Sequence, residues 1–270
     1  MNRFIRKNRY YIIILLILVV TGAGLLQLIT SIRNSNSGNG FGKNNEPVGG
    51  TEYDKKIAYM KDNPDEYPKE VVDFSIKYPE AIDYSYDYPK YKNTCKITGK
   101  TREAHRNGFP LYIQWEKEFG YCSYNTTMIG TGGCGVTAFA ILMSGLTGDF
   151  SNDPAKIAAF SEKNGYCTPG HGTNINIMTE GAAKYGFKSK DIPVVEKLMK
   201  DELDAGKPLV INVGPGEFTF GGHYMVVDGY DEKGFMLLDP NSPKKTDERW
   251  PFDSIKDQIK FVWSYEKIAE

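Results

Sequence analysis

The pattern of hydrophobic and polar residues divides the chain into a uniformly apolar span, a polar stretch and a long region of mixed character. Residues 10–29 are apolar apart from Thr21 and Gln27, and a helix of that length crosses a bilayer. Four basic residues precede the span within residues 1–9, whereas only Arg33 follows soon after it. Because basic residues stay on the cytoplasmic side, we expect a cytoplasmic tail, a transmembrane helix and then an extracellular chain.

A cleaved secretion signal is the alternative for this span, since residues 21–24 are small enough to form a cleavage site. The apolar run continues through residues 25–29, beyond that site, which favours an uncleaved anchor. Both alternatives place the rest of the chain outside the cell.

A linker and a helical prefix follow the span. Residues 30–50 are rich in serine, asparagine and glycine, which is typical of a flexible linker. Residues 51–95 contain three Tyr-Pro pairs. Because proline suits the first turn of a helix, we expect a short helix after each of Pro68, Pro79 and Pro89. The residues expected to be buried in these helices are Val71, Val72, Phe74, Ile76, Ile82 and Tyr84.

Helix and strand signals fill the region that follows, residues 108–266. Helices are predicted at residues 153–165, 173–185 and 193–205, and strands at 207–213, 223–230 and 235–238. Asp153 and Thr173 are the predicted N-caps of the first two helices. The last two strands are close enough in sequence to form a hairpin.

One cysteine stands at the start of a further, apolar helix. Cys134 lies between Gly133 and Gly135, at the head of a run that continues to Met143. The helix-start amides and the helix dipole favour negative charge, which lowers the pKa of a thiol. Neighbours without side chains would also let a carbonyl group approach the sulfur. The pattern indicates a nucleophilic thiolate, with a small buried cysteine that begins a core helix as the alternative.

The hairpin is predicted to bring a histidine and an acid together. His223 begins one strand and Asp239 follows the other. A three-residue turn at 231–233 would set Met225 opposite Asp239, so that Asp239 lies diagonal to His223 on one face. A two- or four-residue turn would need a bulge to restore this parity. Asp228 lies an odd number of positions from His223 and should point away.

The chain from about Phe109 to Tyr265 resembles the papain-like cysteine peptidases, in particular the family 39-like group related to bacteriocin-leader-processing domains. The segments that carry the resemblance are PLYIQW at 110–115, GCGVTA at 133–138, GHYMVV at 222–227 and LDP at 238–240. The resemblance implies an α+β papain-like fold for residues 108–266, in which a helical half with the cysteine-bearing helix packs on an antiparallel sheet. Val136 stands where many relatives have proline, and we expect no catalytic consequence.

By the same resemblance, Cys134 is the nucleophile, His223 the base, Asp239 its orienting group and Gln114 a side-chain donor to the oxyanion. The implied reaction is hydrolysis of a peptide or protein substrate through a thioester, without a cofactor or metal. Three alternatives stay open. They are a cell-wall peptide hydrolase or acyltransferase that uses the same site, a non-catalytic peptide-binding module, and a leader peptidase coupled to an exporter on another chain.

Two segments beside the predicted cleft have open roles. The prefix at residues 51–95 is expected to be a helical cap on the peptidase domain, with an inhibitory pro-segment and a partner-binding module as alternatives. The glycine-bounded loop at residues 214–222 is expected to form one wall of the substrate cleft. Packing of Phe218 and Phe220 beneath the loop is the alternative.

Charge and cysteine content limit the other function classes. Four of the 33 basic residues precede the apolar span, which leaves 29 against 34 acidic residues, a net charge of about −5 outside the cell. This balance argues against nucleic acid and against a polybasic lipid-binding surface. Cys95, Cys122 and Cys167 lack the spacing of zinc ligands. A Cys122–Cys167 disulfide is a candidate, and at least one of the three must stay unpaired within the chain.

Overall fold

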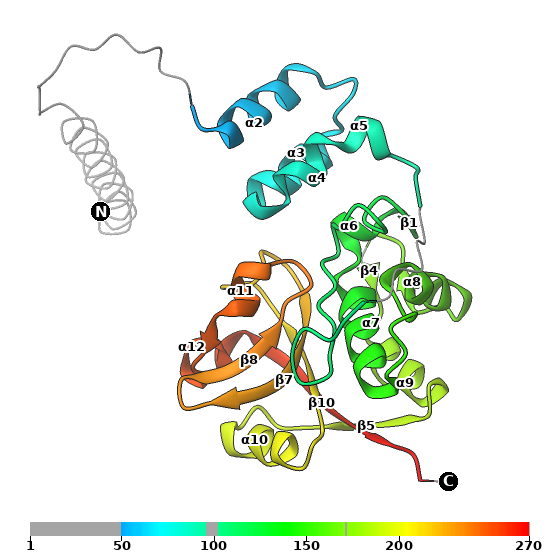
Figure 1. Ribbon diagram of the computed structural model, residues 1–270, viewed down its shortest axis with the longest axis vertical. Helices are drawn as coiled ribbons and strands as arrows, with labels where there is room; N and C mark the ends of the chain where they lie inside the picture. The colour runs from blue at the N-terminus through cyan, green and yellow to red at the C-terminus, as the bar shows by residue number, and fades with distance from the viewer. Residues whose placement is uncertain (1–49, 96–101, 171, 270) are drawn as a thin grey trace, which may run out of the picture. The chain divides into compact units, whose positions relative to one another are not determined.

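A six-stranded antiparallel sheet with the strand order β5-β10-β6-β7-β8-β9 forms one half of the peptidase region (Figure 1). The structure is a computed structural model and describes residues 50–95, 102–170 and 172–269. The strands are β5 (Phe187–Asp191), β6 (Leu209–Val213), β7 (His223–Asp231), β8 (Gly234–Leu238), β9 (Arg249–Trp250) and β10 (Ile259–Lys267).

Both faces of this sheet are buried, because alternate residues of a strand point to opposite sides. In β6, Leu209 and Ile211 belong to one apolar cluster, whereas Val210 belongs to the other. The first cluster includes residues of α10 (Glu196–Asp204), and the second includes residues of α7 (Cys134–Thr147). The sheet therefore separates two cores, and α7 packs against β7 from the helical half.

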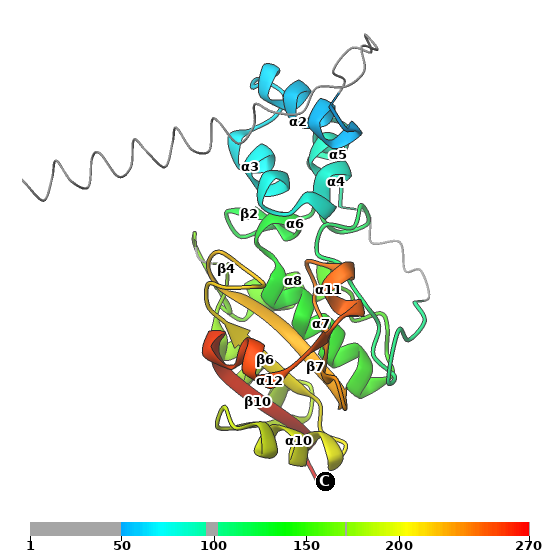
Figure 2. The ribbon, with the colours of Figure 1, turned by 90° about the vertical axis from the view of Figure 1, so that its left-hand side faces the viewer.

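Helix α7 is the centre of the helical half and lies behind the sheet in Figure 2. It is buried from Gly135 to Ser144, as expected for a helix that is apolar on all sides. The other elements of this half are β1 (Ser123–Tyr124), β2 (Thr127–Met128), α6 (Ile129–Gly132), α8 (Pro154–Lys163), β3 (Cys167–Thr168), β4 (Gly172–Thr173), η2 (Ile175–Met178) and α9 (Glu180–Lys184). The predicted α+β architecture, with a cysteine-bearing helix on an antiparallel sheet, is confirmed.

Local capping signals were right for one of two helices. Asp153 caps α8, where its side chain accepts a hydrogen bond from the backbone N–H of Lys156. Thr173 was wrongly predicted as a cap, because its hydroxyl lies 3.0 Å from the Tyr124 hydroxyl within β4. Asn174 caps η2 instead, and its side chain accepts the backbone N–H of Asn176.

The prefix consists of short helices, and three of them begin at or directly after a Tyr-Pro pair, close to the predicted positions. They are α2 (Glu52–Asp62), α3 (Lys69–Lys77), η1 (Pro79–Ala81) with α4 (Ile82–Tyr86), and α5 (Tyr88–Tyr91). Two of the predicted buried residues are not fully buried, since Ile82 is half-buried and Ile76 is 42% exposed. The buried residues of α3 include Val71, Phe74 and Ser75, and the helical period turns Ile76 away from that face.

Aromatic stacking and a disulfide join the prefix to the peptidase region, and both belong to one compact unit. The rings of Tyr84 and Tyr121 stack with centroids 4.6 Å apart, and the Tyr121 hydroxyl donates to the Tyr84 carbonyl. Cys95 at the end of the prefix is bonded to Cys122. The predicted candidate pair of Cys122 with Cys167 is therefore wrong, because Cys122 is bonded to Cys95 and Cys167 is a free thiol.

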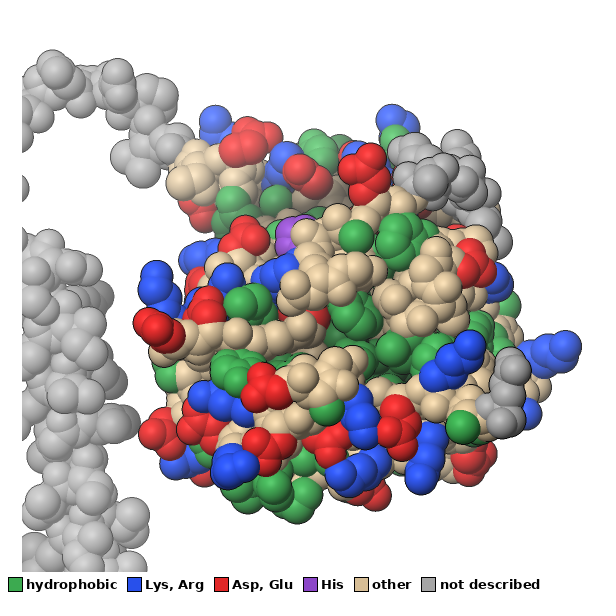
Figure 3. Space-filling view, turned by 60° about the horizontal axis from the view of Figure 1, so that its bottom comes forward, with side chains coloured by type: hydrophobic (Ala, Val, Ile, Leu, Met, Phe, Trp, Pro, Cys, Tyr) green, Lys and Arg blue, Asp and Glu red, His purple; other side chains and the backbone are tan. Residues whose placement is uncertain are grey.

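The described surface mixes charges of both signs. On the face drawn in Figure 3, basic and acidic side chains are interspersed around apolar ones. Pairs such as Lys207–Glu266, at 2.6 Å, contribute to this mixture. That face therefore offers no single-signed field to steer a polyanion.

Residues 1–49, which contain the predicted tail, transmembrane helix and most of the linker, lie outside the described residues. Within residues 50–95, 102–170 and 172–269, no helix has the length and hydropathy needed to span a membrane.

Candidate active site

Cys134 is the first residue of α7 and is partly exposed, whereas the helix behind it is buried. Glycines on both sides allow tight packing around it. A Cβ atom on Gly133 would lie 2.6 Å from the carbonyl oxygen of Ile129, and one on Gly135 would lie 2.5 Å from the Cβ atom of Thr173. Since atoms do not approach so closely without bonding, both positions need glycine for packing, a role that the sequence alone did not reveal.

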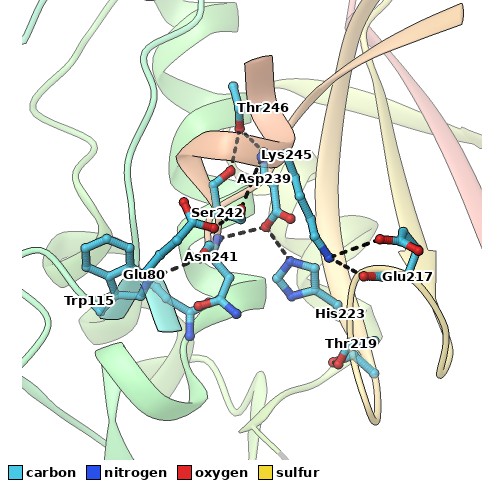
Figure 4. Close-up of polar contacts among 12 residues, drawn as sticks. Glu80, Trp115, Glu217, Thr219, His223, Asp239, Asn241, Ser242, Lys245 and Thr246 are labelled. Carbon is cyan, nitrogen blue, oxygen red and sulfur yellow. Dashed lines mark hydrogen bonds and ion pairs between the residues drawn. The ribbon is translucent and has the colours of Figure 1, made fainter. Parts of the chain in front are cut away.

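His223 and Asp239 meet where β7 begins and β8 ends. The Nε2 atom of His223 lies 2.7 Å from the Oδ1 atom of Asp239, and both side chains are buried (Figure 4). The two residues are 16 positions apart in sequence, so the hairpin alone brings them together. Asp228 does not reach this pair and Asp231 lies at the turn.

The hairpin reaches this arrangement by a different turn from the one predicted. Asp231 pairs with Gly234, so the turn contains two residues, not three. A bulge between Val227 and Gly229 then shifts the register, and Val226 pairs with Leu238. The extra residue in the bulge restores the parity that a two-residue turn would lose. Asp239 therefore lies on the same face as predicted.

Backbone and side-chain contacts fix the Asp239 carboxylate. Its Oδ1 atom also accepts the backbone N–H of Asn241 at 2.8 Å, and its own backbone N–H donates to the Thr246 hydroxyl at 2.9 Å. The Trp115 indole donates to the carbonyl of Asn241 at 3.1 Å. These residues lie around the His223–Asp239 pair in Figure 4, and the carboxylate cannot turn without breaking the bonds of its Oδ1 atom to His223 and Asn241.

Cys134 also acts on this pair, since it is among the groups that raise the pKa of His223. Burial alone would lower the pKa of His223, but the charge of Asp239, its hydrogen bond and the contact with Cys134 raise that pKa to about 10. The imidazole is thus held in its protonated form at neutral pH.

This pKa predicts a titration that can be measured by NMR of ¹⁵N-labelled histidine. The His223 ring should stay protonated as the pH rises and should lose its proton near pH 10. Asp239→Asn removes the negative charge that stabilises the imidazolium, so the midpoint should move to lower pH. An equal titration midpoint in the wild-type and Asp239→Asn proteins would contradict this account of the pair. The His223→Gln variant lacks the His223 signal and so identifies it in the spectrum.

Gln114 is buried between the two halves of the site. Its backbone N–H donates to the Pro240 carbonyl at 2.7 Å, and its side-chain Nε2 donates to the Gly130 carbonyl at 2.8 Å. Gly130 belongs to α6, which directly precedes Cys134 and α7. The amide is therefore tied both to the segment after Asp239 and to the segment before the thiol, with a second N–H of Nε2 left to donate.

A family comparison agrees with this geometry. Residues 106–269 match the model of the family described as Peptidase_C39 like. The chain belongs to the peptidase C39-like family. The resemblance that the sequence motifs indicated is confirmed.

Two solved structures match parts of this C39-like peptidase chain. A C39-like peptidase from Bacillus anthracis shares 16% identity with a TM-score of 0.43, over 63% of this chain and 100% of that one. The peptidase domain of Streptococcus ComA, a bi-functional ABC transporter involved in a quorum sensing pathway, shares 19% identity with a TM-score of 0.38, over 50% of this chain and 92% of that one. Among curated proteins, none matches the chain.

A buried ion pair supports the bulge of this C39-like domain, and sequence reasoning did not find it. Arg106 donates from Nε and Nη2 to the two carboxylate oxygens of Asp228, each at 2.7 Å. The Asp228 side chain is fully buried. Arg106 also donates to the carbonyls of Leu237 and Thr246, so it ties the hairpin to the segment that holds Asp239.

Asp228→Ala should lower the free energy of unfolding by about 3–5 kcal/mol, because it leaves the Arg106 charge largely buried and unpaired. Urea unfolding followed by circular dichroism measures this loss. Asp231→Ala is the matched control, since its ion pair with Arg249 lies at the surface and should matter little. Equal stabilities of the two variants would contradict a structural role for the Arg106–Asp228 pair.

The loop before His223 divides its two phenylalanines between core and surface. Phe218 is buried and packs on Trp250 with ring centroids 4.5 Å apart. Phe220 is 71% exposed and faces Tyr78 of the prefix. The packing alternative is confirmed for Phe218, and the role of the loop as a wall of the substrate cleft stays a prediction. The Tyr78–Pro79 pair was noted only as a helix start, and no local signal linked it to the site.

Within the described residues, no group of three His, Cys, Asp or Glu side chains is arranged to hold a metal ion.

Proposed function

We propose that this protein is a cysteine peptidase that hydrolyses peptide bonds with Cys134, His223 and Asp239. The observation that carries the proposal is the buried 2.7 Å contact between His223 Nε2 and Asp239, with Cys134 among the groups that raise the pKa of the same imidazole. A nucleophile, a base and the group that orients the base are the three parts of a catalytic triad. Membership of the C39-like family supports the same activity.

The first half of the reaction breaks the peptide bond. The Cys134 sulfur attacks the substrate carbonyl, and the oxygen becomes an oxyanion. The backbone N–H of Cys134 and the Nε2 of Gln114 are the proposed donors to that oxyanion. The His223 imidazolium then gives its proton to the leaving amine, and the acyl group stays on sulfur as a thioester.

The second half releases the product. Neutral His223 takes a proton from water, the hydroxide attacks the thioester, and the carboxylic acid leaves. The proton on His223 then balances the thiolate that reforms on Cys134. Asp239 keeps the imidazole oriented through both halves, since its carboxylate accepts from Nε2 and leaves Nδ1 for the sulfur.

We propose further that residues 10–29 anchor the protein in the cell membrane, with the peptidase domain outside. The uniform hydropathy of the span and the basic residues before it support this orientation. The Cys95–Cys122 disulfide also favours an oxidising compartment outside the cytoplasm.

Digestion of a proteome-derived peptide library by the purified full-length protein tests the proposed activity. Mass spectrometry should detect new termini that carry the mass of added water, which distinguishes hydrolysis from acyl transfer. A library that stays intact, while iodoacetamide still modifies Cys134, would contradict the proposed peptidase function.

A further inference from the structure

A groove of about 640 Å³ lies between the prefix and the loop that precedes β7. Helix α3 and Tyr78 line the prefix side of this groove. Thr219, Phe220 and Gly221 line the other side. The groove is therefore bordered by the prefix at residues 51–95 and by the loop at residues 214–222, the two segments whose roles the sequence left open.

Two lining residues of the groove lie close in sequence to the proposed catalytic residues. Thr131 in its lining lies three residues before Cys134, and Gly221 lies two residues before His223. A ligand in the groove would thus lie beside the backbone that carries both groups. Cys134 remains partly exposed, so the docked prefix leaves the thiol accessible.

Tyr78 is a prefix residue that contacts the loop before His223. Its ring meets Phe220 edge to face, with centroids 6.5 Å apart, and Tyr78 lines the groove together with Thr219 and Phe220. Burial raises the pKa of Tyr78, and the charges of Cys134 and Asp239 raise it further.

Contacts directly after Tyr78 hold the prefix in place. The Glu80 carboxylate accepts the Ser242 hydroxyl, and it also accepts the backbone N–H of Lys244 at 3.1 Å. Ser242 caps α11 (Pro243–Asp247), the helix whose Thr246 bonds the backbone of Asp239. The prefix is therefore attached to the same segment that positions the orienting carboxylate.

A second contact connects the prefix with the proposed oxyanion donor. A Cβ atom on Gly130 would lie 2.4 Å from the ring of Tyr84, so the tyrosine packs directly on this glycine. The carbonyl of Gly130 is the acceptor that holds the Gln114 side chain. Together with the disulfide, these contacts make the prefix a fixed part of the site.

We propose that the prefix forms a permanent wall of the substrate groove, and that Tyr78 and Phe220 bind an apolar side chain of the peptide next to the scissile bond. This inference rests on the proposed peptidase function. An extended peptide fits the lining, because threonine hydroxyls and the charged side chains of Glu70, Asp73 and Lys77 can bond its polar groups while the two rings contact an apolar side chain. The 71% exposure of Phe220 is what a contact residue for an apolar ligand requires.

Cleavage of the proteome-derived peptide library by full-length variants tests this wall. Tyr78→Ala should lower kcat/KM about tenfold and weaken the preference for apolar residues near the cleaved bond, since the aromatic contact is lost. Tyr78→Phe keeps the ring and should retain the preference.

Tyr59→Ala is the control, because it removes a 47% exposed tyrosine of α2 outside the groove and should behave as wild type. Iodoacetamide modification of Cys134 should proceed at one rate in all four proteins, and thermal unfolding checks their folding.

Each other outcome has a distinct meaning. Unchanged cleavage and preference in Tyr78→Ala would overturn the substrate wall and leave a structural cap. Faster cleavage would also overturn it and indicate an inhibitory prefix. If iodoacetamide modifies Cys134 of the wild-type protein but the protein cleaves no peptide, the peptidase function itself is overturned. The proposed substrate wall is then overturned as well.

Discussion

Cys134→Ala should reduce peptide cleavage below detection, a loss on the order of 10⁶-fold, while the protein stays folded. The loss is total because no other group in the site can form the thioester. Folding should persist because Cys134 is partly exposed at the first position of α7, and the buried residues behind it make the core contacts. Cleavage of the peptide library and thermal unfolding measure the two effects separately.

Cys167→Ala is the matched control for this variant. Cys167 is the other free cysteine in the described part of the chain, and it is also partly exposed. Its replacement should leave cleavage near the wild-type rate. Activity that survives in Cys134→Ala but disappears in Cys167→Ala would transfer the nucleophile to Cys167.

Asp239→Asn should lower kcat/KM by about 10²–10⁴-fold, with most of the loss in kcat. The amide oxygen can still accept the Asn241 backbone N–H, so the local fold should survive. The negative charge that holds His223 protonated is lost, and the amide can no longer fix the tautomer of the ring. Steady-state kinetics on a library peptide measures the loss.

A second substitution separates charge from packing at this position. Asp239→Ala removes both the charge and the hydrogen bond to Asn241, and its activity should be no higher than that of Asp239→Asn. Asp228→Asn is the control. It removes the same charge from another buried acid, which contacts Arg106 and not His223. Loss of activity only in the Asp228 variant, measured on folded protein, would contradict the assignment of Asp239.

The hairpin shows how far strand parity can be predicted from sequence. The period of two put Asp239 on the face of His223, but through a three-residue turn, whereas the structure has a two-residue turn and a bulge that together give the same parity. The bulge was not predicted, because it depends on Asp228 and its ion pair with Arg106, 122 positions earlier in the chain. Such long-range pairs leave no local pattern.

The prefix illustrates the same limit. Proline restricts the backbone locally, so the starts of α3, η1 and α5 could be read from the Tyr-Pro pairs. The docking of Tyr84 on Gly130 and the bond between Cys95 and Cys122 depend on tertiary contacts. Sequence spacing alone therefore gave a wrong candidate partner for Cys122, and it did not connect Tyr78 to the site.

The central claim is that Cys134 is an activated nucleophile beside a protonated His223. Its most direct test is reaction of the full-length protein with a peptidyl chloromethyl ketone at neutral pH, followed by mass-spectrometric mapping of the modified cysteine. The predicted result is modification of Cys134 at least about tenfold faster than Cys167, and slower modification in Asp239→Asn. Equal modification of the two thiols, or preferential modification of Cys167, would contradict the claim.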